Sequence, residues 1–342
     1  MAYTTIKKPS DYFNTKLYTG NGGTQSITDL GFQPDLTWIK QRGGTTSHVF
    51  YDAVRGAYWT IQSNTTNSQT ADDGLTAWNS GGWNMGNVST TNGNGLSYVG
   101  WNWKAGGGQG SSNTDGSINT TYTSANTTTG FSISKYTGNA SAGATIGHGL
   151  GSVPKMVIVK KTNGAKDWNV YHVGMGATKG MYLNLTNAEQ THGNWNNTTP
   201  TNTVFSIGSD DQVNGSGQTY ITYCFAEKQG FSKFGSYVGN GNADGTFVYT
   251  GFKPKFILTK NSSASSTSWV LTDTSRSTYN VTSNALMADA STAEQAYTYF
   301  DITSNGFKAR NTSHWVNGSG NTIIYMAFAE EPLVGDNPAT AR

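Results

Sequence analysis

Tyr18-Thr19-Gly20-Asn21 recurs twice further along the chain, as Tyr136-Thr137-Gly138-Asn139 and Tyr237-Val238-Gly239-Asn240. Each copy continues in the same way. A Gly-x-x-Pro turn follows at Pro34, Pro154 and Pro254, and a lysine stands six positions after each proline, at Lys40, Lys160 and Lys260. Each copy closes on Asn-Gly-x-Gly, beginning at Asn92, Asn214 and Asn317. Fixed spacing around variable loops is the mark of an internal repeat. The sequence therefore predicts three tandem copies.

Short runs of β-branched and aromatic residues follow the proline turns and predict one strand seen three times: Leu36 to Lys40, Lys155 to Lys160 and Lys255 to Lys260. The closing segments are apolar at nearly every position, which is typical of central strands: Ser97 to Trp103, Thr219 to Phe225 and Thr322 to Phe328. Convincing helical periodicity is absent. We expect an all-β chain of three tandem antiparallel β-sandwich domains, each of about 100 residues. A lectin-like jelly roll is the preferred topology, and an immunoglobulin-like sandwich is the alternative.

The repeat pattern also sets the expected domain boundaries. The first sandwich covers residues 1–108, the second 130–230 and the third 231–332. Residues 109–129 are rich in Gly, Ser and Thr, a composition that predicts a flexible linker. Residues 333–342 carry two prolines and few apolar side chains, and we expect them to form an extended tail.

Composition narrows the class of protein. The 22 basic and 20 acidic residues give a net charge of +2 and form no blocks, so the sequence has no electrostatic footprint for nucleic acid or anionic lipid. We expect no membrane insertion, because no segment approaches a transmembrane span, and the first residues lack the apolar core of a secretory signal. The single cysteine, Cys224, excludes an internal disulfide and predicts a buried thiol.

No catalytic residues, metal ligands or cofactor are predicted. Asp-x-x-Arg occurs at Asp52 and Arg55 and again at Asp273 and Arg276, while His172 takes the place of the aspartate in the second copy. A strand-end ion pair or turn cap explains this pattern better than a catalytic pair. The five histidines show no metal-ligand spacing. Calcium held at the paired aspartates, Asp72-Asp73 or Asp210-Asp211, is a weaker alternative.

Aromatic and amide side chains in presumed loops are the remaining feature of the sequence that could serve a function. Aromatic faces stack on sugar rings and amides bond to hydroxyls, so the mixture suits glycan binding, although it also suits sandwich cores and subunit contacts. The candidate ligand-binding residues are Trp59, Trp78, Trp195, Trp315, Asn194 and Asn196. Trp83 aligns with Phe205 and Phe307, which predicts a core position for it. Trp195 and Trp315 have no evident counterparts, so we expect them to contact something outside the domain.

Several of these motifs carry a resemblance over nearly the whole chain. They are Tyr18 to Gly22, Gly31 to Lys40, Tyr51 to Gly56, Val99 to Ala105, His148 to Gly151 and Ala327 to Glu330. The sequence resembles a family of tandem-repeat virion proteins, uncharacterised in function, from tailed phages of marine and other aquatic bacteria. The resemblance implies lectin-like β-sandwiches at the particle surface or tail, made in the host cytoplasm and located in the virion. It supplies no catalytic residue.

The leading hypothesis is a non-enzymatic structural protein of a phage tail fibre or adhesion device that contacts host surface polysaccharide. The rival hypothesis is a capsid decoration, head fibre or tail component that binds other virion proteins. Further copies of the chain are expected partners, and a trimer is one possible assembly. A glycan depolymerase ranks third, since the sequence shows no paired carboxylates in a local or repeated arrangement.

Overall fold

A computed structural model describes residues 3–334 and 338–340, and it is built almost entirely of antiparallel strands, which confirms the all-β prediction. The first large sheet has the order β1-β9-β3-β4-β5-β6, with bounds Phe13–Thr19, Ser97–Trp103, Leu36–Gln41, Val49–Asp52, Trp59–Gln62 and Thr70–Ala71. The second has the order β10-β11-β18-β13-β14-β15-β16, with bounds Tyr122–Asn126, Phe131–Thr137, Thr219–Ala226, Pro154–Lys161, Asn169–His172, Lys179–Tyr182 and Gln190–Thr191. The third has the order β19-β26-β21-β22-β23, with bounds Ser232–Val238, Thr322–Pro332, Phe252–Asn261, Val270–Asp273 and Leu286–Met287. Five strands thus follow the same order in all three large sheets, and the second sheet has an additional edge strand, β10.

A smaller sheet lies against the outer face of each large one, and we call each large sheet with its small sheet a unit. The small sheets are β2-β8-β7 (Gln25–Ile27, Gly82–Met85, Ala77–Asn79), β12-β17 (Ala144–Gly147, Val204–Ile207) and β20-β25-β24 (Phe247–Tyr249, Gly306–Ala309, Phe300–Thr303). In the first unit, Tyr18 and Ile39 of the large sheet pack on Ile27 and Trp83 of the small one. Short helices are confined to η1 (Pro9–Asp11), α1 (Ser89–Asn92) and η2 (Gly193–Trp195) in the described residues.

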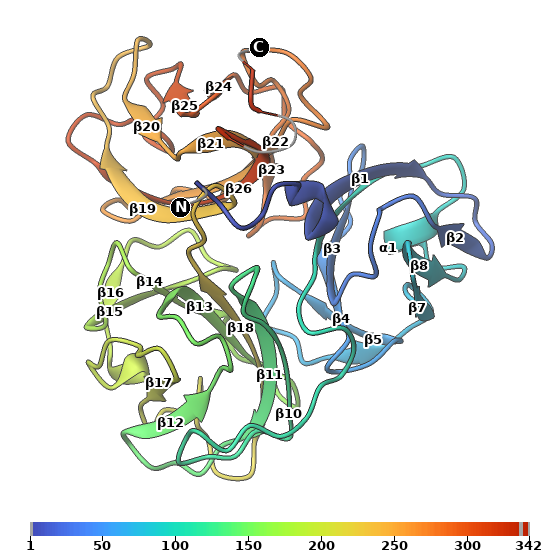
Figure 1. Cartoon of the computed structure of the whole chain (residues 1–342), viewed down its shortest axis with the longest axis vertical. Coiled ribbons are helices and arrows are strands. Elements are labelled where there is room, and N and C mark those ends of the chain that lie inside the picture. Colours follow the sequence, from blue (N-terminus) through green and yellow to red (C-terminus); the bar gives the residue numbers. More distant parts are fainter. Residues whose placement is uncertain (1–2, 335–337, 341–342) are drawn as a thin grey trace.

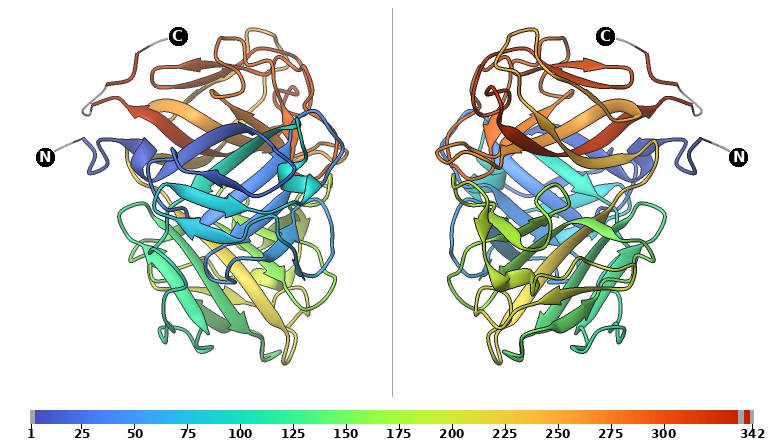
Figure 2. Two further views of the ribbon diagram at one scale, coloured as in Figure 1. Left: turned by 90° about the vertical axis from the view of Figure 1, so that its right-hand side faces the viewer. Right: turned by 90° about the vertical axis from the view of Figure 1, so that its left-hand side faces the viewer.

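The inner faces of the three large sheets meet in one shared core. Figure 1 shows these sheets around a common centre, and Figure 2 shows both ends of the described chain on the same side of the molecule. The ring of Phe328 lies 5.0 Å from Phe13, 5.8 Å from Trp103 and 6.1 Å from Phe225, measured between ring centroids, so it touches the other two units. The units therefore form a closed ring around shared aromatic side chains and are not separate domains in a row.

Equivalent contacts join each unit to the next around the ring. Three backbone amides donate to the neighbouring unit at corresponding positions: Gln69 N to Thr162 O (3.0 Å), Glu189 N to Ser262 O (2.8 Å) and Glu294 N to Arg42 O (2.7 Å). Two buried indoles repeat a second contact. Trp168 Nε1 donates to Gln62 O and Trp269 Nε1 donates to Tyr182 O, each at 2.9 Å. The contact from Glu294 N to Arg42 O links the last unit of the chain to the first and closes the ring.

The proline turns and the apolar closing segments hold the positions expected of them. The closing segments become β9, β18 and β26, and each lies between two partners inside its large sheet. Pro154 opens β13, Pro254 lies within β21, and both ladders shift register at the proline. Because proline has no N–H to donate, it is tolerated at such irregular positions. Pro34 is buried two residues before β3.

The segment predicted as a flexible linker, residues 109–129, is instead part of the fold. Its residues Tyr122–Asn126 form β10, which pairs antiparallel with β11 of the second large sheet. The preceding glycine run is fixed as well. Asp35, which is fully buried, accepts from the backbone N–H groups of Ala105 (2.7 Å), Gly107 (3.0 Å) and Gly108 (2.6 Å). The expected tail, 333–342, lies partly outside the described residues.

Candidate functional site

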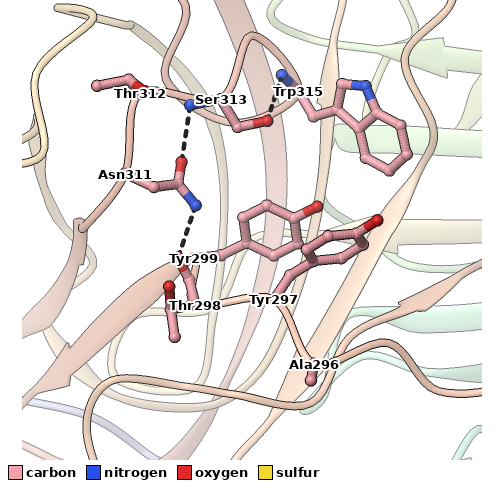
Figure 3. A pocket seen from close by; sticks show the side chains of 8 residues that line it. All are labelled: Ala296, Tyr297, Thr298, Tyr299, Asn311, Thr312, Ser313 and Trp315. Atoms are coloured by element: carbon pink, nitrogen blue, oxygen red, sulfur yellow. Dashed lines mark hydrogen bonds between the residues drawn. The ribbon is translucent and has the colours of Figure 1, made fainter.

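An open pocket of about 390 Å³ lies between two loops of the third unit. One loop precedes β24 and the other follows β25. The lining residues are Ala296, Tyr297, Thr298, Tyr299, Asn311, Thr312, Ser313 and Trp315 (Figure 3). The pocket combines three aromatic rings with amide and hydroxyl groups, and it contains Trp315, one of the residues singled out from the sequence.

The aromatic rings form two walls of different exposure. Tyr297 is 44% exposed, whereas Tyr299 is buried and Trp315 is half-buried against the third unit's core. The ring centroids of Tyr297 and Trp315 are 6.2 Å apart with planes at 66°, and those of Tyr297 and Tyr299 are 5.5 Å apart at 39°. Figure 3 shows Trp315 facing the two tyrosines from the opposite loop. Angled aromatic faces of this kind offer stacking surface to a flat ligand.

The polar side of the pocket is held by Asn311. Its Nδ2 donates to Thr298 O at 2.6 Å, and its Oδ1 accepts from Ser313 N at 3.0 Å, so one amide ties the two loops together. Ser313 Oγ in turn accepts from Trp315 N at 3.3 Å, which positions the indole. Burial, and then the neighbouring Tyr297, raise the pKa of Tyr299, so its phenol stays neutral at physiological pH.

The pocket is a property of the third unit. Trp315 stands two residues before Asn317 of the closing Asn-Gly-x-Gly motif, and the residues two before Asn92 and Asn214 are Thr90 and Gln212. Neither of these offers an aromatic face. The asymmetry matters because the three units otherwise share the same strand order.

The other tryptophan candidates from the sequence lie elsewhere. Trp59 is 39% exposed on β5. Trp78 is half-buried on β7 and packs on the first unit's outer core. Trp195 is 2% exposed and packs edge-on against Tyr171 at 6.0 Å, so the expectation that it contacts an outside partner is wrong.

The two asparagine candidates divide in the same way. Asn194 is 4% exposed and its Nδ2 donates to Asn169 Oδ1 at 2.6 Å, so it belongs to the interior. Asn196 is exposed, but it ends η2 in the left-handed conformation (φ 49°), a position that asparagine tolerates well. Neither reaches the Trp315 pocket. Sequence reasoning missed Tyr297, Tyr299 and Asn311, although the run Tyr297-Thr298-Tyr299 is a visible aromatic signal.

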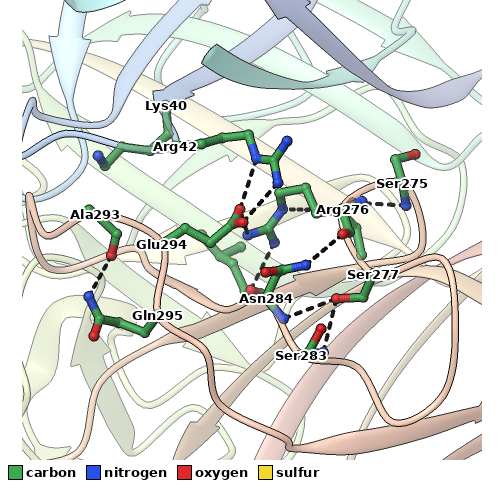
Figure 4. Close-up of polar contacts among 12 residues, drawn as sticks. Lys40, Arg42, Ser275, Arg276, Ser277, Ser283, Asn284, Ala293, Glu294 and Gln295 are labelled. Atoms are coloured by element: carbon green, nitrogen blue, oxygen red, sulfur yellow. Dashed lines mark hydrogen bonds and ion pairs between the residues drawn. The ribbon is translucent and has the colours of Figure 1, made fainter. Parts of the chain in front are cut away.

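The Asp-x-x-Arg pairs lie in the interior, at the junctions between units. Arg276 Nε lies 2.5 Å from Asp273 Oδ2, and both side chains are fully buried. Trp101 of the first unit donates its Nε1 to the same Asp273 oxygen at 3.0 Å. Glu294 bridges Arg276 (3.2 Å) and Arg42 (2.8 Å), and Figure 4 shows the three side chains converging. These charges join the units to one another.

The second unit, which lacks the aspartate, uses a different contact at the same junction. His172 is buried, and its Nε2 lies 3.0 Å from Tyr325 O of the third unit. Burial lowers the pKa of His172 to about 4, so the ring is neutral and can share a hydrogen bond with the carbonyl. The third unit has Met326 at the position where the first two units have Trp101 and Tyr223, which donate to the aspartates. Methionine has no N–H or O–H to donate, so an aspartate would have no such partner at this junction.

Across residues 3–334 and 338–340, no group of three or more His, Cys, Asp or Glu side chains is placed to hold a metal ion. Within the same residues, no helix has the length and apolar character needed to cross a membrane.

Comparison with curated proteins finds no match to this chain. The model of one family matches residues 8–332, which is nearly the whole sequence. The chain therefore belongs to the family described as "Domain of unknown function (DUF7483)".

Proposed function

We propose that this chain is a non-enzymatic structural protein of a phage virion, part of a tail fibre or adhesion device, that contacts host surface glycans. The observation that carries the glycan contact is the Trp315 pocket, where aromatic, amide and hydroxyl groups line one open depression. The sequence resemblance to tandem-repeat virion proteins supports the setting in a phage particle.

The pocket chemistry favours sugars over other small molecules. Aromatic faces pack against the C–H faces of sugar rings, while amides and hydroxyls bond to sugar hydroxyls. The rings of Tyr297 and Trp315 supply the first kind of contact, and Asn311 and Ser313 supply the second. A closed ring of three units with the pocket already formed suits such a role, because a preformed site loses little conformational freedom on binding.

A second candidate function is a capsid decoration, head fibre or tail component that binds other virion proteins. The observation in its favour is the outer strand β20, where Phe247 is 45% exposed and Tyr249 is 55% exposed on the same face. Val238, at the end of β19, is 57% exposed. Exposed aromatic side chains are enriched in protein interfaces.

The test is adsorption of the purified full chain to host cells, together with calorimetry against polysaccharide extracted from the host envelope. We expect saturable binding that extracted polysaccharide competes away. Electron cryomicroscopy of the particle then separates the two candidates, since it locates the chain at the tail or on the shell. A location on the shell without any glycan binding would favour the decoration role and end the adhesion proposal.

A further inference from the structure

We infer that the Trp315 pocket selects a neutral sugar, and that each chain binds one such ligand. The inference deepens the proposed glycan contact and rests on it. It follows from the charge of the lining, from the hydrogen-bonding groups that remain for a ligand, from the size of the pocket and from its occurrence in one unit.

The lining offers no charge to an acidic sugar. None of its eight residues is an aspartate, glutamate, lysine, arginine or histidine. Two basic side chains stand on that loop. Arg310 is engaged with Asp301 (3.3 Å) and Asp244 (3.5 Å), and His314, whose exposed ring lies edge-on to Trp315 at 6.4 Å, is not one of the lining residues. A carboxylate or sulfate placed on the exposed aromatic faces would lose water without gaining a cation from the eight lining residues, which is costly.

The remaining hydrogen-bonding groups suit hydroxyls, which both donate and accept. Asn311 uses one amide proton on Thr298 O, and the second forms no bond within the described residues. Ser313 Oγ accepts from Trp315 N and retains its own proton. Thr312, which is exposed, adds a further hydroxyl to the lining. Neutral donors and acceptors of this kind match the hydroxyl groups of an uncharged sugar.

Size and number follow from the geometry. At about 390 Å³, the pocket is at the lower end of the roughly 300–1,000 Å³ usual for small-molecule sites, which fits a short glycan segment. Thr90 and Gln212 replace Trp315 in the other units, so those units lack the facing aromatic wall. One site per chain is therefore expected, even though three units are present.

The test is calorimetry of the full chain against two groups of oligosaccharides. The neutral group comprises oligomers of glucose, galactose, mannose and N-acetylglucosamine, and the acidic group comprises oligogalacturonate and sulfated galactan. We expect at least one neutral oligomer to bind with a stoichiometry of one per chain, and the acidic oligomers not to bind. Tyr297→Ala, at a side chain that is 44% exposed, and Trp315→Ala should each weaken binding at least tenfold. Trp59→Ala, which removes an exposed indole from β5 of the first unit, is the matched control and should change nothing.

The outcomes separate this inference from the proposed function. Binding of acidic oligomers, a stoichiometry of three, or binding that Tyr297→Ala leaves unchanged would overturn the assignment to the Trp315 pocket while leaving adhesion intact. If neither the oligomers nor host envelope polysaccharide nor host cells bind the folded chain, the adhesion proposal fails together with it.

Discussion

The buried pair of Asp52 and Arg55 shows how strongly the stability of this interior depends on one charged side chain. Arg55 Nε lies 2.5 Å from Asp52 Oδ2, and the two side chains are 1% and 0% exposed. The hydroxyl of Tyr223, from the second unit, donates to the same oxygen at 2.8 Å. Breaking a buried ion pair by removing one charge typically costs about 3–5 kcal/mol, because the other charge stays buried and uncompensated.

We therefore expect Asp52→Asn to lower the free energy of unfolding by about 3 kcal/mol in urea denaturation. Asp273→Asn is the matched comparison in the third unit. It should cost less, since Arg276 keeps a second carboxylate, Glu294, at 3.2 Å. Equal losses for the two variants would show that charge compensation is not what stabilises these sites.

The sequence predicted the local half of this arrangement. The spacing of Asp52 and Arg55 predicts a strand-end pair or a turn cap, and the structure has both, because Arg55 N also donates to Asp52 Oδ1 at 2.8 Å. Local spacing contains no sign of Tyr223, which is 171 residues away. The packing of three units brings it there, so the role of the pair as a junction became visible only in the structure.

The three aligned lysines, Lys40, Lys160 and Lys260, are fully buried and donate to backbone carbonyls. Burial lowers the pKa of Lys160 to about 7 and the pKa values of Lys40 and Lys260 to about 8. In the unfolded chain a lysine holds its proton up to about pH 10.4. At these three sites the unfolded state therefore binds more protons than the folded state above pH 7, and this contribution makes stability increase with pH.

We expect the free energy of unfolding to rise between pH 7 and about pH 9. Unfolding exposes Cys224, whose pKa burial raises to about 12, and this opposes the rise only in part. If each lysine is replaced by Met in turn, Lys160→Met should reduce the slope between pH 7 and 8 more than the other two variants, because the pKa of Lys160 is the lowest of the three. Urea denaturation at several pH values measures the slope, and a stability that is constant or falls over this range would contradict the assignment.

Among the elements and their connections, the glycine run before β10 depends on one carboxylate. Asp35→Ala removes the acceptor of three backbone N–H groups, of Ala105, Gly107 and Gly108. Hydrogen bonds to a charged group contribute about 1.5–3 kcal/mol each in other proteins, so a loss of at least about 3 kcal/mol is expected. Hydrogen exchange should increase first in residues 105–110. Asp29→Ala, which removes an exposed ion pair with Lys16, is the control and should have little effect.

Strands were easier to predict than the loops between them. A run such as Leu36 to Lys40 is read correctly because its residues favour strands and the preceding proline sets its start. Residues 109–129 were misread because composition shows that side chains are polar but not whether they find partners. Here Ser112 Oγ donates to Thr120 O at 2.7 Å, and Thr123 Oγ1 donates to Ser134 Oγ at 2.9 Å, so the polar side chains hold the segment in place.

For the whole molecule, the sequence predicts that there are three repeats, but it does not predict how they are arranged in space. Nothing in the motif spacing distinguishes a row of units from a ring. The ring arises because the inner faces of the large sheets are aromatic and can be buried only against one another. Its closing junction adds the Arg42–Glu294 ion pair to the contacts shared by all three.

The shared core predicts that the units unfold together, and Cys224 provides the probe. This thiol is fully buried in the second unit, so a thiol reagent reaches it only when that unit opens. Phe13 belongs to the first unit, and its ring contacts Trp103, Phe256 and Phe328, which lie in the first and third units. Phe13→Ala should cost about 3–5 kcal/mol.

If unfolding is cooperative, Phe13→Ala accelerates the labelling of Cys224 at least a hundredfold, about 2.7 kcal/mol or more, and tryptophan fluorescence reports the same loss of stability in urea. Trp59→Ala, at an exposed side chain of the same unit, should leave the labelling rate unchanged. Independent units predict the opposite. The fluorescence transition of Phe13→Ala would split in two while Cys224 stays protected from the reagent, because the stability of the second unit's core would not depend on a ring in the first unit.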